Sequence, residues 1–176
     1  TGITVIALAG IVCDQSIRIA GDEFTADIME ALRRYHSPLI GERTSEQIKI
    51  QVGAAMKDID NPPDDFAVNG RDLVTGIPKQ IMVSYQEIAE ALDKSIFKIE
   101  EAILKALEQT PPELAADIYR RGLYITGGGA LLRGLDKRLS QKIKLPVHVA
   151  DDPLKSVVRG TGIALKNYDR YPFVMR

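Results

Sequence analysis

Residues 123–139 read LYITGGGALLRGLDKRL, in which three glycines separate two apolar patterns. The apolar run at 123–126 favours a buried strand. After the glycines, leucines at 131, 132, 135 and 139 recur at the spacing of one face of a helix. A strand that passes through a tight turn into a helix is a building unit of α/β proteins. This run therefore predicts an α/β layered domain.

Gly127, Gly128 and Gly129 are also the clearest functional signal in the sequence. Glycine allows a positive φ and lets a ligand approach the backbone with no Cβ in the way. The N-terminus of a helix adds free N–H groups and a positive dipole end, which favour phosphates. The triplet therefore predicts a nucleotide-binding loop, and a plain turn is the alternative.

Two common nucleotide motifs do not fit this loop. A phosphate loop needs Gly-Lys-Ser or Gly-Lys-Thr, and neither occurs in the chain. A dinucleotide fingerprint needs glycine where Leu132 stands, although Asp151 lies where a ribose-binding acid is expected. The 47 residues after Gly129 are also too few for the usual series of βα units. The dinucleotide interpretation therefore fails.

The elements on either side of the glycine loop extend the same pattern. Downstream, residues 147–149 predict a strand, and a final helix runs towards Tyr168. Upstream, a short helix is expected at 112–121. Before it, Ser84 and Glu87 form a capping box that opens an apolar stripe of about 26 residues, roughly 39 Å long. We expect this stripe to form one helix, or two that divide near Asp93.

The first half of the chain predicts a hairpin and then a group of smaller elements. Two strands, at 3–8 and 11–19, are expected to join at Ala9-Gly10. A helix follows from Asp22, and a second helix opens with a capping box of Thr44 and Gln47. Three short strands are expected after it, the first two joined by a turn at Asn69-Gly70, and they cover 66–68, 73–74 and 80–83.

This order favours two subdomains. Residues 1–21 and 81–176 would form a large α/β subdomain, and residues 22–80 a small α+β subdomain inserted into it. A strand that begins as early as Ile3 indicates that the chain is cut at its start, with a true terminus as the alternative.

The composition excludes several classes of protein. The chain has 176 residues, 45% of them hydrophobic and 27% charged, which fits one sizeable globular domain and not a disordered tail. The formal charge of −1 and the lack of a dense basic tract argue against nucleic-acid binding. Cys13 is the only cysteine, so an intrachain disulfide is excluded and a reducing, intracellular setting is expected. No run approaches the roughly 18 apolar residues of a membrane-spanning helix.

Glu46 and Lys49 form the second candidate site. Three residues apart on a helix, their side chains project to one side, away from the apolar face. They could form a solvated surface ion pair, or they could reach a ribose or adenine lying against the helix. No catalytic residue and no metal site can be assigned, because the acids Asp14, Asp22 and Asp27 belong to no recognisable set.

Several blocks resemble one family, the MreB-like bacterial actin homologues. The closest likeness is the adenosine-binding motif at 124–136, YITGGGALLRGLD. The other similar blocks, which together span almost the whole chain, are QSIRIAGD at 15–22, LIGE at 39–42, QTPPELA at 109–115, ADDPL at 150–154 and VRGTG at 158–162.

The resemblance implies an actin-like, ribonuclease-H-like ATPase fold that binds ATP or ADP with Mg²⁺ in a cleft between two domains. This chain would be the second domain, and its final helix would pack against the absent first one. It implies filaments at the inner face of the cell membrane that guide the wall-synthesis machinery and maintain rod shape. By matching position, the residues at the nucleotide would be Gly127, Gly128, Gly129, Ala130, Glu46, Gln47, Ile48 and Lys49.

Thr1 is similar to the end of the family's second phosphate loop, and Gly2 stands where many relatives have glutamate. The rest of that loop and the first domain would precede Thr1, so we expect the chain alone to hydrolyse ATP poorly or not at all. Three rival interpretations stay open: an FtsA-type domain, a DnaK-type domain, and a non-catalytic interaction module.

Overall fold

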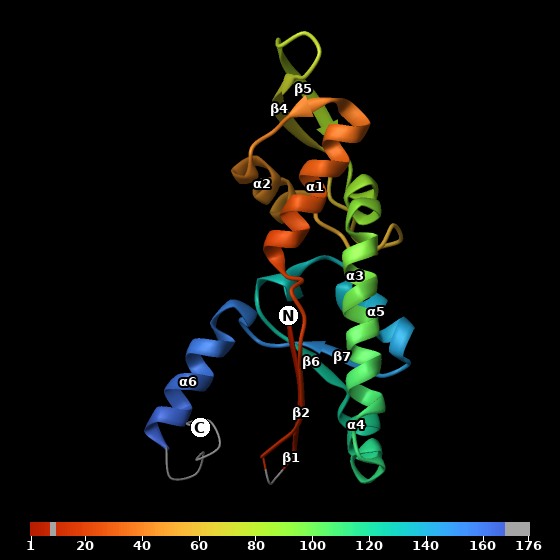
Figure 1. Ribbon diagram of the computed structural model, residues 1–176, viewed down its shortest axis with the longest axis vertical. Helices are drawn as coiled ribbons and strands as arrows, with labels where there is room; N and C mark the ends of the chain where they lie inside the picture. The colour runs from red at the N-terminus through yellow and green to blue at the C-terminus, as the bar shows by residue number, and fades with distance from the viewer. Residues whose placement is uncertain (8–9, 168–176) are drawn as a thin grey trace.

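A computed structural model describes residues 1–7 and 10–167. The molecule is elongated, with the β4–β5 hairpin at one end and the β1–β2 strands with α4 at the other (Figure 1). Its elements in chain order are β1 (Gly2–Ala7), β2 (Gly10–Ser16), α1 (Gly21–His36), β3 (Pro38–Leu39), α2 (Glu42–Val52), β4 (Phe66–Asp72), β5 (Pro78–Val83), α3 (Tyr85–Glu108), the 3₁₀ turn η1 (Pro112–Leu114), α4 (Ala115–Arg121), β6 (Leu123–Ile125), η2 (Gly128–Leu131), α5 (Leu135–Ile143), β7 (Val147–Val149), η3 (Pro153–Lys155) and α6 (Ser156–Lys166).

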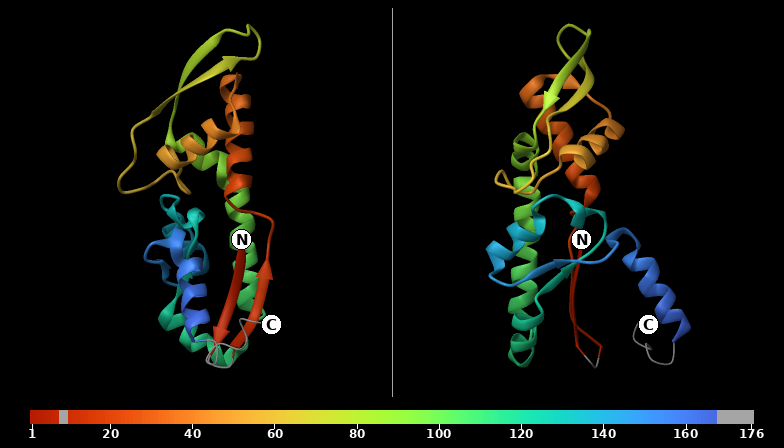
Figure 2. Two further views of the ribbon diagram at one scale, coloured as in Figure 1. Left: turned by 90° about the vertical axis from the view of Figure 1, so that its left-hand side faces the viewer. Right: turned by 180° about the vertical axis from the view of Figure 1, so that it is seen from behind.

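The helix α3 joins the two ends of the molecule (Figures 1 and 2). Its 24 residues form one continuous helix, about 36 Å long, so the alternative of a break near Asp93 is wrong. The predicted capping box at its start is confirmed: Ser84 Oγ accepts from the Glu87 N–H, and Glu87 Oε2 accepts from the Ser84 N–H at 2.9 Å. The apolar stripe is buried, and Ile88, Leu92 and Ile96 are all fully inaccessible.

The antiparallel pairing of the first hairpin is confirmed, although Gly10 belongs to β2 and not to the turn, and β2 ends at Ser16 and not at 19. The position of the second turn is a correction. β1 and β2 pair antiparallel, and their connection at residues 8–9 lies outside the described residues. The predicted turn at Asn69-Gly70 is wrong, because both residues lie inside β4, which pairs antiparallel with β5. The chain turns instead after Asp72, where the residues expected as a second strand, 73–74, begin the turn. Asp72 Oδ1 accepts the N–H groups of Val74 and Thr75 at 2.9 Å, a local alternative to the strand ladder.

The predicted capping box at Thr44 is wrong. α2 begins at Glu42 with Gly41 as its N-cap, so Thr44 lies within the first turn. The backbone carbonyl of Gly41 accepts the N–H groups of Thr44 and Ser45, both at 3.1 Å. The Thr44 hydroxyl therefore does not cap the helix, because Thr44 lies inside the first turn and not at the N-cap position.

The elements around the glycine triplet differ in two ways from the sequence expectation. β6 pairs with β7 in parallel and is half-exposed, with Tyr124 71% accessible, although a buried strand was expected. Among the residues the structure describes, β7 is the one strand that pairs with β6, so the other edge of β6 has no strand beside it. The glycines also lead into the short 3₁₀ turn η2, and the helix α5 starts only at Leu135. Between η2 and α5 lie Leu132, whose backbone is extended, and Gly134, whose φ is +74°.

The last helix, α6, carries no buried residue and stands apart from α3 on the far side of the β-sheets (Figures 1 and 2). It ends at Lys166, so the expected extension to Tyr168 lies outside the described residues. Among the described helices, none combines the length and the apolar character needed to cross a bilayer. The division into residues 1–21 with 81–176 and residues 22–80 stays a prediction.

Candidate functional site

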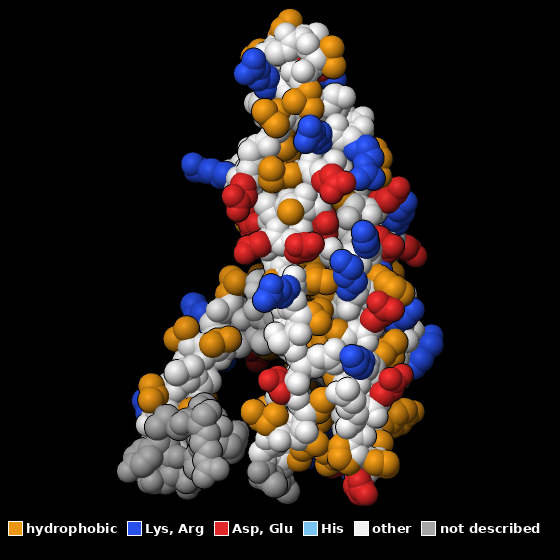
Figure 3. Space-filling model, viewed as in Figure 1, with side chains coloured by type: hydrophobic (Ala, Val, Ile, Leu, Met, Phe, Trp, Pro, Cys, Tyr) orange, Lys and Arg blue, Asp and Glu red, His pale blue; other side chains and the backbone are white. Residues whose placement is uncertain are grey.

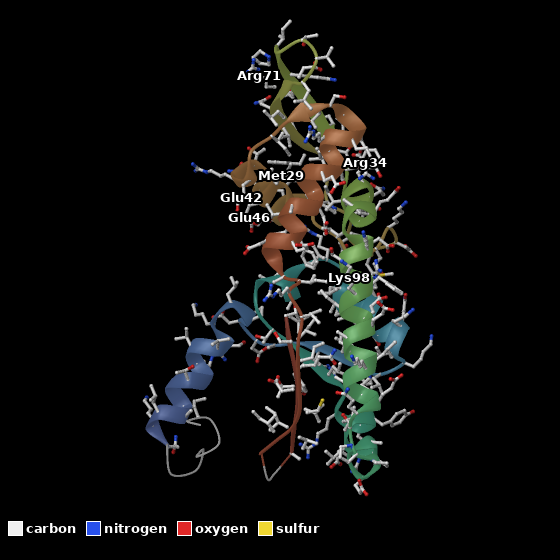
Figure 4. All side chains as sticks on the ribbon, in the orientation of Figure 1. Met29, Arg34, Glu42, Glu46, Arg71 and Lys98 are labelled. Carbon is white, nitrogen blue, oxygen red and sulfur yellow. The ribbon has the colours of Figure 1, made fainter. Side chains whose placement is uncertain are left out.

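The pair Glu46 and Lys49 lies on α2, and both side chains contact Thr25 of α1. Figure 4 labels Glu46 on α2. Lys49 Nζ is 2.6 Å from Glu46 Oε2 and donates to the Gly21 carbonyl at 2.9 Å. It also donates to Thr25 Oγ1 at 3.0 Å. The pair is thus a partly exposed ion pair within a network that ties α2 to the first turn of α1, and its contact with a ribose or adenine stays a prediction.

The network is buried on one side and open on the other. The Lys49 side chain is 15% exposed and that of Glu46 is 47% exposed. The Lys49 hydrogen bond is the main reason that the pKa of Glu46 lies below its ordinary value; burial opposes this, and Thr25 adds to it. The carboxylate therefore stays ionised at neutral pH and acts as an acceptor only.

The four consecutive residues predicted on α2 do not face the same way. Gln47 is exposed, whereas Ile48 is fully buried and belongs to the hydrophobic core. The 3.6-residue period of the helix explains this, because neighbours in sequence point about 100° apart. Glu46 and Lys49, three residues apart, share one face, and Ile48 anchors α2 from behind.

The glycine triplet forms an open backbone turn. Gly127 has φ +84°, a conformation that side chains disfavour, and its N–H donates to the Pro153 carbonyl at 3.0 Å. Gly128 and Gly129 are exposed, and Ala130 is buried. A Cβ built on Gly129 would meet nothing within 4 Å, and one on Gly128 would meet only a Leu154 methyl at 3.4 Å. Internal packing therefore does not demand glycine at either position, which leaves the approach of a ligand as a reason.

A backbone bridge connects this turn to α2. Ala54 and Arg133 form an isolated parallel bridge, in which the Ala55 N–H donates to the Arg133 carbonyl at 2.8 Å. The Arg133 guanidinium reaches the Gly53 carbonyl at 3.4 Å. A Cβ on Gly53 would lie 2.1 Å from the Lys49 carbonyl, so glycine is needed where the chain leaves α2. The segments that follow the two predicted parts of the site are thus joined, at Ala54 after α2 and at Arg133 after η2.

Thr1 lies near the other end of the same network. Its hydroxyl donates to the Ile19 carbonyl, and its own carbonyl accepts the Ile17 N–H at 2.9 Å. The segment that Thr1 contacts continues to Gly21, whose carbonyl accepts from Lys49 at 2.9 Å. Sequence reasoning missed the residues that make these connections, namely Thr25, Gly53 and Arg133. Nothing local marks Thr25 and Arg133, since the partners that connect them to the site lie 21 to 83 residues away.

A surface hollow among the described residues lies elsewhere. It is an open hollow of about 520 Å³ between the loop after α2 and the helices α3 and α5, and it holds none of the predicted site residues. Its charged groups are already paired, Lys57 with Glu90 and Arg138 with Asp93, each at 2.8 Å. Among the described residues there is also no group of three or more His, Cys, Asp or Glu side chains able to hold a metal. We therefore take α2 and the glycine turn as the candidate site.

Known proteins match this chain over nearly all its length. A family profile described as MreB/Mbl protein matches residues 1–172. The chain is 46% identical to the cell shape-determining protein Mbl of Bacillus subtilis over 172 residues, which are 98% of this chain and 51% of Mbl. It is 45% identical to the cell shape-determining protein MreB of Escherichia coli over 174 residues, 97% of this chain and 49% of MreB. The chain thus spans about half the length of the curated relatives it matches.

Solved structures agree with this match. MreB5 of Spiroplasma citri bound to ADP superposes with a TM-score of 0.85 at 37% identity, covering 93% of this chain and 49% of MreB5. A MamK double helical filament superposes with a TM-score of 0.66 at 20% identity, covering 80% and 42%, which supports the fold alone. The fold is an actin-like α/β fold, and an FtsA-type or DnaK-type origin is set aside. The chain belongs to the MreB/Mbl family.

Proposed function

We propose that this chain is the nucleotide-binding half of a filament-forming bacterial actin homologue that maintains rod cell shape. The observation that carries the proposal is the open glycine turn at Gly127–Gly129, tied by the Ala54–Arg133 bridge to the Glu46–Lys49 network. MreB5 of Spiroplasma citri, whose structure was solved with ADP, supports a nucleotide as the ligand.

In this proposal the site residues have different tasks. The exposed backbone of Gly128 and Gly129, with half-buried Gly127 before it, receives the nucleotide without side-chain obstruction, and buried Ala130 anchors the turn. Glu46 accepts hydrogen bonds from the nucleoside, and Gln47, exposed beside it, contributes its amide. Ile48 holds α2 in the core, and Lys49 orients Glu46. Thr1 lies on the phosphate side.

ATP hydrolysis requires more than these residues. Phosphoryl transfer needs a magnesium ion, groups that hold it, and a group that orients the attacking water. The ion would arrive with ATP or ADP and be held chiefly by the other half of a full-length relative. We therefore expect a hydrolysis rate far below that of an intact actin-like ATPase when this chain is assayed alone.

The proposed assembly and location follow from the family. A complete protein would form filaments with copies of itself, at the inner face of the cell membrane, and would guide wall-synthesis proteins. The fold shared with a filament-forming protein, MamK, is consistent with self-association. No nucleic-acid partner is proposed, since the net charge of −1 offers no cationic surface for a phosphate backbone.

Calorimetry with Mg-ADP tests the proposal. A Gly128→Val variant adds a branched side chain where the backbone is open, and we expect Mg-ADP to bind it at least about tenfold more weakly. Gly160→Val is the matched control, because Gly160 is exposed on α6 and a Cβ there meets nothing within 4 Å. The control should bind like the unmodified chain.

Two results would count against the proposal. If the unmodified chain binds neither ADP nor ATP, the non-catalytic interaction module is favoured. If Gly128→Val binds as tightly as Gly160→Val, nucleotide binding does not use the glycine turn. Both variants should be compared at equal folded fraction, checked by circular dichroism.

A further inference from the structure

The ammonium group of Lys49 is fully engaged within the protein. It donates to the Gly21 carbonyl at 2.9 Å and to Thr25 Oγ1 at 3.0 Å, and it forms an ion pair with Glu46 Oε2 at 2.6 Å. With its side chain only 15% exposed, it cannot turn to a ligand without breaking one of these bonds. Lys49 is therefore suited to orienting its neighbours.

Glu46 is held by one oxygen and free at the other. Oε2 is the oxygen that contacts both Lys49 Nζ, at 2.6 Å, and Thr25 Oγ1, at 2.8 Å. Among the residues that the structure describes, no hydrogen bond reaches Oε1. The side chain is 47% exposed, so a ligand can reach this second oxygen.

Thr25 supplies the second bond to Oε2 from a different helix. It lies on α1, 4% exposed, and its hydroxyl accepts a proton from Lys49. The one proton of that hydroxyl has two acceptors in reach, Glu46 Oε2 at 2.8 Å and the Gly21 carbonyl at 2.9 Å. If the carboxylate shifts toward a ligand, the hydroxyl can turn to Gly21, and no buried donor is left without a partner.

We propose that Thr25 is a positioning residue of the nucleotide site, which fixes Oε2 of Glu46 so that Oε1 accepts a hydrogen bond from the nucleoside. This inference rests on the proposed function. A carboxylate can only accept, so its counterpart must be a donor. On a nucleoside this donor is a ribose hydroxyl or the adenine amino group, whereas ionised phosphates offer none.

Calorimetric titration of the chain with Mg-ADP tests the role of Thr25. Thr25→Val keeps the shape of the side chain and removes the hydroxyl, and Thr25→Ser restores it. We expect Thr25→Val to weaken Mg-ADP binding about three- to tenfold, and Thr25→Ser to stay within about twofold of the unmodified chain. In a Glu46→Ala background, Thr25→Val should cause no further loss, because the group it positions is gone.

Two ADP analogues distinguish whether a ribose hydroxyl or the adenine amino group donates to Glu46. Against 2′,3′-dideoxy-ADP, which lacks the ribose hydroxyls, the effect of Thr25→Val should vanish if Glu46 binds the ribose. Against inosine diphosphate, which lacks the adenine amino group, it should vanish if Glu46 binds the base. If the effect persists undiminished with both analogues, Glu46 does not accept from the nucleoside and the proposal is overturned.

The remaining outcomes each decide the proposal. Equal Mg-ADP affinity of Thr25→Val and the unmodified chain overturns it. An equal loss with and without Glu46 also overturns it, since Thr25 would then act only through general stability. If the unmodified chain does not bind Mg-ADP, the proposed function fails. NMR titration of the Glu46 carboxyl group then tests whether Thr25 positions it. A pKa of Glu46 that is unchanged in Thr25→Val shows that Thr25 does not hold it.

Discussion

The two ends of this molecule are packed very differently. The closed region, residues 21–83 with the first half of α3, buries its apolar side chains completely at Ile28, Leu32 and Ile48. The open region, formed by β1–β2, β6–β7, α4 and α6, has no fully buried side chain in either of its helices. Figure 3 shows apolar side chains on the surface of this end, and those that are more than half exposed include Ile6, Ile11, Tyr119, Tyr124, Val157, Val158 and Leu165.

The difference teaches that apolar periodicity and burial are separate properties. α1 and α6 both carry apolar residues at helical spacing, yet α1 buries five residues and α6 none. Burial of apolar surface is the main favourable term in folding. The closed region should therefore supply most of the stability of this chain, and its α2 carries the Glu46–Lys49 part of the candidate site.

The strongest test compares one leucine from each region. Leu92 is fully buried on α3, and we expect Leu92→Ala to lower the free energy of unfolding by about 2 to 5 kcal/mol because it leaves a cavity. Leu165 is 63% exposed on α6, and Leu165→Ala should change the free energy of unfolding by less than about 0.5 kcal/mol. Urea denaturation of both variants measures the contrast. Equal losses would mean that α6 is packed in solution and that the open region is not open.

A smaller effect distinguishes the two capping boxes that the sequence suggested. Ser84→Ala removes a cap observed at the start of α3, and should lower the free energy of unfolding by about 1 kcal/mol. Thr44→Ala changes a residue already inside α2, and should stay within about 0.5 kcal/mol of the unmodified chain. Thermal unfolding followed by circular dichroism measures both. A larger loss for Thr44→Ala would contradict the observed start of α2.

The smallest expected effect is the acid sensitivity of the closed region. Burial would raise the pKa of Glu87, but the Ser84 N–H and the His36 ring hold it below its ordinary value of 4.5. A lowered folded pKa means that the stabilisation is present above the unfolded value and is lost as the pH falls through the folded one. Unfolding free energies measured from pH 6 to pH 3 should therefore decrease.

Glu87→Gln is the control for this titration. Glutamine can still accept the Ser84 N–H, but it does not ionise, so the decrease between pH 5 and pH 3 should be shallower. The same slope in both proteins would mean that other carboxylates cause the acid loss. Glu113, exposed in η1, offers a second comparison, since Glu113→Gln should leave the slope unchanged.

Local signals in the sequence predicted much of the fold. The capping box at Ser84, the apolar stripe behind it and the hairpin at the start of the chain need only nearby residues, and all three are confirmed. The predictions failed where a competing local interaction won. Asp72 binds the backbone of its own turn, so the chain reverses there and Asn69-Gly70 stays in the strand.

The candidate site was predictable only in part, for the same reason. The glycines stand out because three adjacent residues without Cβ have few structural causes, and the Glu46–Lys49 spacing follows from helix geometry. Thr25 and Arg133 could not be found this way. Their partners come from other elements, and the registry between those elements is set by tertiary packing.

The continuity of α3 has a consequence for protein engineering. Residues 22–80 look like a module that could be deleted or exchanged between homologues at the boundaries 21/22 and 80/81. Such a graft would leave the first turns of α3 behind, with Ile88 and Leu92 stripped of the helices that cover them. A transferable cassette must therefore carry the N-terminal half of α3 with it, and exchange is easiest between relatives whose α3 keeps the volume of its buried face.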